Sequence, residues 1–222
     1  MAESRKQKWA RERDETLVRE RALWADGHRL VAGVDEVGVG PLAGPLVAAA
    51  VILPSHIAID GVRDSKKVSP KRREALFEEI CRAALSWSVG EVSPSEVDRL
   101  NPYHGALEAM RRAVTSLQDR PDHVLVDART IPDIPEPQTA IVQGDASVYS
   151  IAAASIVAKV SRDRQMAELD RTFPGYGFAR HAGYGTAQHL RALDELGPCP
   201  AHRKSFAPVR DRLIDASGKK TR

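Results

Sequence analysis

The sequence predicts an α/β protein built on one mixed sheet. Residues 30–37, 46–53 and 86–92 read as three early strands joined by turns. Further along, short strands at 123–127 and 139–145 alternate with helices, which is the pattern of parallel strands. The 222 residues suit one large domain with extensions. We therefore expect antiparallel strands first, then parallel strands, with helices on the faces of the sheet.

The first half of the chain supplies the antiparallel part. The glycine- and proline-rich stretch 38–45 predicts a turn between the first two apolar strands. Ser69 as N-cap and Pro70 at the first helical position predict a helix that runs to about Ala84. Residues 86–92 then alternate between polar and apolar side chains, as a third strand would.

Helices dominate the second half. Those expected are 94–100, 103–118, 147–170 and 186–196. The longest contains the small apolar run 151–158, which suits close packing on a sheet. Three prolines, Pro132, Pro135 and Pro137, predict an extended loop before the strand at 139–145.

Three regions are expected from charge and pattern. Residues 1–28 are a charged arm, helical or partly ordered, that enters the domain at Trp24. Residues 29–209 form the main domain, including a helical C-terminal extension. Residues 210–222 form a basic tail.

Composition narrows the class of protein. The net charge of +3 permits a polyanionic partner without requiring one. No run approaches the ~18 apolar residues of a membrane helix, and the polar N-terminus carries no signal core, so a cytoplasmic protein is expected. Cys81 and Cys199 are far apart and suggest no disulfide framework. Cys199 and His202 have the spacing of half a zinc knuckle without a second pair, so we interpret them as a free thiol and a structural or surface histidine.

Four acids stand where apolar strands are expected to end. Asp35 and Glu36 close the first strand, Asp127 a later one, and Asp145 the last, just before the long helix. Sites in open α/β sheets gather at the carboxyl ends of strands, and converging carboxylates repel unless cations hold them. Oxygen ligands suit Mg²⁺ or Mn²⁺, and two such ions ~4 Å apart suit in-line cleavage of a phosphodiester.

Each acid also has a structural interpretation. Asp145 would cap the long helix, Asp127 would be a turn aspartate, and Glu36 would face solvent. Taken singly, these are the better explanations, whereas the shared position at strand ends favours the catalytic one. A nucleic-acid-binding module without activity would account for the basic residues but not for the acids.

The stretch 38–45, called the glycine loop below, is also compatible with a different function. Gly38, Gly40 and Ala43 fit the dinucleotide-binding fingerprint, with Asp60 or Asp64 near the distance of a ribose-binding acid. A nicotinamide-dependent enzyme is disfavoured because the acids would face the pyrophosphate. The fingerprint also requires a helix after the loop, and this pattern reads as strand, turn and strand.

Six blocks of sequence resemble bacterial ribonuclease HII. They are residues 33–53, residues 64–70 (Asp64-Ser-Lys-Lys-Val-Ser-Pro70), Gly144-Asp145, residues 150–163, Gly183-Tyr184-Gly185-Thr186 with His189, and residues 202–208. They occur in the family's order and span roughly residues 23–209. The family usually has Arg where this chain has Val39, and residues 101–105 also depart from its pattern.

The resemblance implies a ribonuclease H-like fold and a Mg²⁺- or Mn²⁺-dependent endonuclease. Its substrates would be the RNA strand of RNA–DNA hybrids and single ribonucleotides embedded in duplex DNA, nicked on their 5′ side as in ribonucleotide excision repair. Two ions would act, and the products would carry 3′-hydroxyl and 5′-phosphate ends. The chain is expected to work as a monomer.

The resemblance also implies roles for particular residues. The catalytic and metal-binding acids would be Asp35, Glu36, Asp127 and Asp145. The substrate-binding residues would be Gly38, Val39 and Gly40 in the motif that reads the RNA–DNA junction, Tyr184 as the junction-sensing tyrosine, and Ser65 and Lys66 along the phosphate path.

Overall fold

The structure is a computed structural model that describes residues 3–57 and 59–213. Most of the expected basic tail, residues 214–222, lies outside the described residues.

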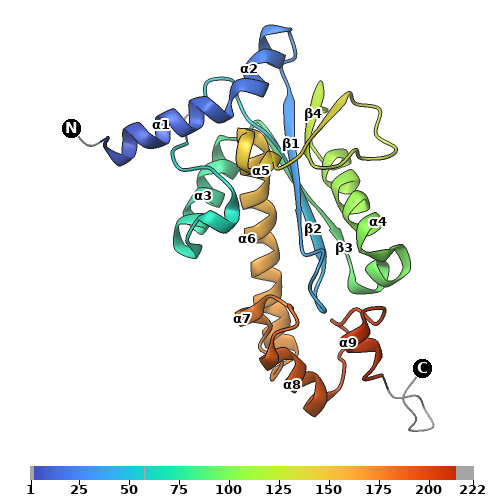
Figure 1. The fold of residues 1–222 in the computed structure, drawn as a ribbon. Helices are drawn as coiled ribbons and strands as arrows, with labels where there is room; N and C mark the ends of the chain where they lie inside the picture. The colour runs from blue at the N-terminus through green and yellow to red at the C-terminus, as the bar shows by residue number, and fades with distance from the viewer. Residues whose placement is uncertain (1–2, 58, 214–222) are drawn as a thin grey trace.

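One five-stranded sheet in the order β3-β2-β1-β4-β5 organises the molecule (Figure 1). The strands are β1 (Val31–Val37), β2 (Leu46–Ile52), β3 (Ser86–Val92), β4 (His123–Asp127) and β5 (Gln138–Ile141). β2 is antiparallel to both β1 and β3, whereas β1, β4 and β5 run parallel. The predicted mixed sheet is confirmed.

Both faces of the sheet are buried, which explains why its central strands are almost entirely apolar. Along β2, Ala48 and Ala50 pack toward the helix α4 (Pro94–Thr115). Ala49 and Val51 pack on the other face, toward α6 (Tyr149–Thr172) and α3 (Pro70–Ala83). Figure 1 shows α6 and α3 on one side of the sheet and α4 on the other.

The other helices are shorter. They are α1 (Arg5–Thr16), α2 (Val18–Ala25), the 3-10 turn η1 (Ser65–Lys67), α5 (Gly144–Ser147), α7 (Phe178–His181), α8 (Ala187–Leu196) and α9 (Ala207–Arg210). The last three form the expected helical C-terminal extension. The expected pair of helices at 94–100 and 103–118 is one element broken at Asn101, whose φ is +64°, and it ends at Thr115.

One strand prediction is wrong at its end. Residues 139–145 do not form a continuous strand, because β5 stops at Ile141 and Gln143 adopts a left-handed φ of +55°. Gly144 then begins the short helix α5, so Asp145 lies in a helical turn and not at a strand end. The long helix α6 starts at Tyr149, two residues later than expected.

The N-terminal arm is helical and packs on the domain before Trp24 is reached. Leu17 is buried in the core, and Arg13 pairs with Asp60 at 3.3 Å. The buried Glu20 accepts a 2.7 Å hydrogen bond from the N–H of Ser150 in the first turn of α6. Among the described helices, none is long and apolar enough to cross a membrane.

Candidate active site

The parallel pairing of β1 with β4 brings two acids together. Val34 is in register with Val126, so Asp35 and Asp127 follow side by side on neighbouring strands. β4 ends at Asp127 because Ala128 adopts a left-handed φ of +55°. Asp35 and Glu36 follow each other on one strand and therefore face opposite sides of the sheet.

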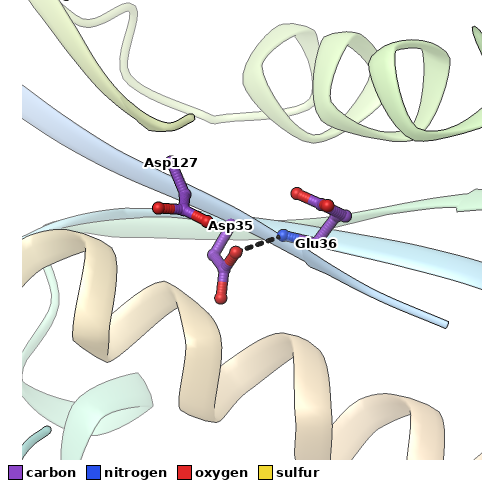
Figure 2. A group of neighbouring side chains, drawn as sticks. All are labelled: Asp35, Glu36 and Asp127. Carbon is purple, nitrogen blue, oxygen red and sulfur yellow. Dashed lines mark hydrogen bonds between the residues drawn. The ribbon is translucent and has the colours of Figure 1, made fainter. Parts of the chain in front are cut away.

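Three carboxylates meet near the carboxyl ends of β1 and β4. Ligand oxygens of Asp35, Glu36 and Asp127 all lie within 4.8 Å of one another (Figure 2). The side chain of Asp35 is buried on the α6 side, and its Oδ1 accepts the N–H of Glu36 at 2.8 Å. Oδ1 of Asp127 accepts the N–H of Gly144 at 2.7 Å.

The three acids are hard to ionise together. Burial, and then the nearby Glu36 carboxylate, raises the pKa of Asp35 well above its usual value. Burial also raises the pKa of Glu36 and of Asp127, and the charge of Asp127 adds to the effect on Glu36. A cation placed among the three carboxylates would offset their mutual repulsion and the cost of burying their charge.

The fourth predicted acid is a neighbour of this cluster and not one of its three members. Asp145 lies on α5, and its charge raises the pKa of Asp127. Its Oδ2 is 3.7 Å from Nζ of Lys66, whose side chain is otherwise exposed. Burial lowers the pKa of Lys66, but the surrounding carboxylates, first those of Asp145 and Asp64, together raise it by more.

Ser65, the other residue predicted along the phosphate path, is buried. Its hydroxyl oxygen is hydrogen-bonded to that of Ser155 on α6 at 3.0 Å. Ser155 in turn hydrogen-bonds Asp35 and lowers the pKa of that carboxyl.

Sequence reasoning missed Arg129. Its Nη1 lies 3.1 Å from Oε1 of Glu36, and its guanidinium sits 5.3 Å from the centre of the exposed ring of Tyr103. A basic residue two positions after a strand-end acid was the available signal. Ser155 was hidden because its partners lie about a hundred residues away along the chain.

The glycine loop and the predicted junction tyrosine face each other. A Cβ added at Gly40 would lie 3.8 Å from Cε1 of Tyr184. The N–H of Leu42 bonds the carbonyl of Gly183, which fixes the two turns together. Tyr184 is 48% exposed, so its ring is not part of the core.

A relay of buried histidines anchors the Tyr184 turn. The N–H of Cys199 donates to Nδ1 of His202, so Nε2 of His202 carries the proton and donates to Nε2 of His189 at 3.0 Å. Nδ1 of His189 then donates to the carbonyl of Tyr184 at 2.9 Å. Cys199 is a free thiol and His202 is buried, which confirms their structural interpretation.

The relay predicts a loss of stability in acid. Burial, and then the nearby His189, lowers the pKa of His202 to about 4, whereas an unfolded histidine titrates near about 6.5. The unfolded chain therefore binds the proton first, and stability is lost as the pH falls from about 6.5 toward about 4. We expect about 2 kcal/mol less unfolding free energy from this residue at pH 5 than at pH 7.5. Urea titrations at both pH values should show a smaller drop for His202→Gln, and an equal drop would contradict the relay.

The family model for ribonuclease HII matches residues 32–209. The chain belongs to the ribonuclease HII family. Ribonuclease HII of Myxococcus xanthus is 55% identical over 195 residues, which is 87% of this chain and 67% of that protein. The enzyme of Geobacillus thermodenitrificans is 53% identical over 94% of this chain and 80% of its own length. The solved structure of ribonuclease H2 from Pyrococcus horikoshii superposes with a TM-score of 0.68 at 29% identity, covering 81% of this chain and 95% of that one.

Membership of the ribonuclease HII family makes the chain a hydrolytic endoribonuclease that acts on RNA–DNA hybrids. A binding module without activity is thereby excluded. The nicotinamide alternative also fails, because residues 38–45 lead into the antiparallel strand β2 and not into a helix.

Proposed function

We propose that the chain hydrolyses phosphodiesters at ribonucleotides with two divalent ions, Mg²⁺ or Mn²⁺, and nicks duplex DNA on the 5′ side of a single embedded ribonucleotide. The convergence of Asp35, Glu36 and Asp127 within 4.8 Å carries this proposal. The products would have 3′-hydroxyl and 5′-phosphate ends.

The donor set fits hard divalent ions. All three groups offer carboxylate oxygens, which Mg²⁺ and Mn²⁺ prefer. Burial and the neighbouring carboxylates raise the pKa of Asp35, Glu36 and Asp127, and a divalent ion among them would favour their charged forms. We assign Asp145, on α5, as the fourth ligand because its carboxylate is near enough to raise the pKa of Asp127. Arg129, which holds Glu36 at 3.1 Å, would have to share or release that carboxylate.

Backbone N–H groups hold two of the carboxylates in position. The N–H of Glu36 fixes one oxygen of Asp35, and the N–H of Gly144 fixes one oxygen of Asp127. These hydrogen bonds set the direction of both carboxylates before any ion arrives. When bound, a pair of divalent ions supplies the Lewis acidity for in-line attack by water and for departure of the ribose 3′-oxygen.

Substrate contacts are assigned around this centre. Gly38 follows Glu36 by two residues, and Gly40 faces Tyr184. We therefore propose that Gly38, Val39 and Gly40 hold the ribose and the sugar next to it. Lys66 is exposed beside Asp145 and would bind a phosphate. Because Ser65 is buried, we propose that it supports Asp35 through Ser155 and does not touch the phosphate.

Replacement of Tyr184 tests the substrate assignment. Tyr184→Ala should lose about 100-fold in kcat/KM on a duplex with one ribonucleotide, since misplacement by about 1 Å costs that much in a site that works by positioning. The loss on an all-RNA hybrid strand should be smaller, because a continuous RNA strand offers many registers.

Tyr184→Phe serves as the control, because it keeps the ring and should retain most activity on both duplexes. The melting temperatures of both variants should stay close to wild type, since the ring is half exposed. Equal fractional losses on the two duplexes would remove Tyr184 from junction recognition.

A further inference from the structure

Two arginines are fully buried behind the glycine loop. Arg162 on α6 and Arg203 before α9 are both 0% exposed. Neither forms an ion pair with any residue that the structure describes. A buried cation costs several kcal/mol unless other groups compensate it, so the hydrogen bonds of these guanidinium groups must carry that role.

Both guanidinium groups donate to backbone carbonyls. Arg203 donates from Nη1 to Val39 at 3.0 Å, from Nη2 to Gly38 at 2.6 Å, and from Nη2 and Nε to Gly44 at 2.9 and 3.1 Å. Arg162 donates to the carbonyls of Pro45 at 2.9 Å, Ala182 at 3.0 Å and Ala43 at 3.2 Å. Arg162 thus ties the end of the loop to the Tyr184 turn, whereas Arg203 joins the beginning of the loop, at Gly38 and Val39, to Gly44 near its end.

The peptide geometry then sets the direction of two amides. The carbonyl of Gly38 shares a planar peptide with the N–H of Val39, and the carbonyl of Val39 shares one with the N–H of Gly40. No peptide in the described chain is cis, so each N–H points opposite to its carbonyl and therefore away from Arg203. Gly40 is exposed and Val39 is partly exposed.

These two amides have no acceptor among the residues that the structure describes. Within residues 3–57 and 59–213, neither the N–H of Val39 nor that of Gly40 donates a hydrogen bond. A charged donor on the carbonyl side also polarises the peptide and strengthens the N–H as a donor. Burial, and then Arg162, lowers the pKa of Arg203 to about 9, which leaves it protonated at neutral pH.

We propose that Arg203 is a positioning residue that presents the N–H groups of Val39 and Gly40 as polarised donors to the ribose 2′-hydroxyl oxygen of the substrate. The inference rests on the proposed function and extends it to a residue of the C-terminal extension that touches no substrate. It also makes recognition at residue 39 a property of the backbone, which is compatible with an apolar side chain at that position.

Arg203→Lys tests the proposal, because it keeps the charge but cannot reach all three carbonyls as a planar fork does. Affinity is measured in EDTA, where turnover is blocked, for a duplex with one ribonucleotide and for an all-DNA duplex of the same sequence. We expect about tenfold weaker binding of the ribonucleotide duplex, the value of one hydrogen bond, with little change for DNA.

Arg112→Lys on α4 is the matched control. Arg112 also holds a backbone carbonyl, that of Glu91 at 2.6 Å, together with the carboxylates of Glu96 and Glu108. It should lose stability while preserving the preference for the ribonucleotide. A lower melting temperature of Arg203→Lys with an unchanged preference would reduce Arg203 to a structural residue and overturn the proposal.

A measurement on the unmodified protein covers the case in which Arg203→Lys fails to fold. The amide resonances of Val39 and Gly40 should shift on titration with the ribonucleotide duplex and stay in place with the DNA duplex. Resonances that do not respond would overturn the proposal. A wild-type protein that binds both duplexes equally would instead overturn the proposed function, and with it this inference.

Discussion

Asp127→Asn is expected to reduce nicking on the order of 1000-fold while the fold stays intact. Asp127 is the last residue of β4, and its carboxylate lies in the cluster with Asp35 and Glu36. Loss of its charge removes an ion ligand, whereas the neutral amide oxygen can still accept the N–H of Gly144. Because burial already raises the pKa of Asp127, the variant should melt no lower than wild type in EDTA.

Asp133→Asn is the matched control for this prediction. Asp133 lies in the same loop region, is exposed, and has a left-handed φ of +55° that asparagine tolerates. It should keep wild-type activity and wild-type Mn²⁺ binding in a calorimetric titration, whereas Asp127→Asn should bind the ion more weakly. Near-normal nicking by Asp127→Asn would remove it from the metal site.

Gly33→Ala should cost more than about 3 kcal/mol of unfolding free energy, or prevent folding altogether. A Cβ at Gly33 would lie 2.1 Å from the carbonyl carbon of Ser150 and 2.3 Å from its oxygen. These are backbone atoms of α6, so relief requires the helix to move away from β1. Ser155, which supports Asp35, would move with it, and activity should fall even where the variant folds.

Gly105→Ala provides the contrast within the same protein. Its added Cβ would meet only side-chain carbons at 3.7 to 3.8 Å, and the residue lies inside α4. Replacement of a helical glycine should stabilise by up to about 1 kcal/mol. Denaturant titrations of both variants give the comparison, and a Gly33→Ala protein as stable as wild type would contradict the close packing of α6 on β1.

The sequence was sufficient to predict the sheet because the patterns that indicate strands are local in the chain. Apolar runs predicted the first two strands and the strand at 123–127, and alternation of polar and apolar residues predicted the strand at 86–92. Acids at the strand ends predicted the cluster of Asp35, Glu36 and Asp127. The prediction of a strand at 139–145 was wrong at its C-terminal end. The residues from Thr139 to Ile141 have a strand-like pattern, and no neighbouring residue indicates the left-handed conformation of Gln143. Asp145 was therefore expected at a strand end and lies instead in a helix.

The supporting residues could not be predicted, because their roles depend on contacts between distant parts of the chain. Ser155 reaches Ser65, ninety positions away, and Arg203 reaches Gly38, which is 165 positions away. In sequence, Arg162 and Arg203 are ordinary surface-type residues in polar surroundings. Only the fold shows that both are buried and bound to backbone carbonyls.

We propose that this acidic cluster directs metal-dependent nicking at a single ribonucleotide. The decisive assay uses an end-labelled DNA duplex that contains one ribonucleotide, incubated with Mg²⁺, Mn²⁺ or EDTA and resolved at single-nucleotide resolution beside an all-DNA duplex. We predict one nick, on the 5′ side of the ribonucleotide, with a 3′-hydroxyl on the upstream fragment, and none in EDTA or on DNA. An intact duplex with both ions, or equal cleavage in EDTA, would contradict the account.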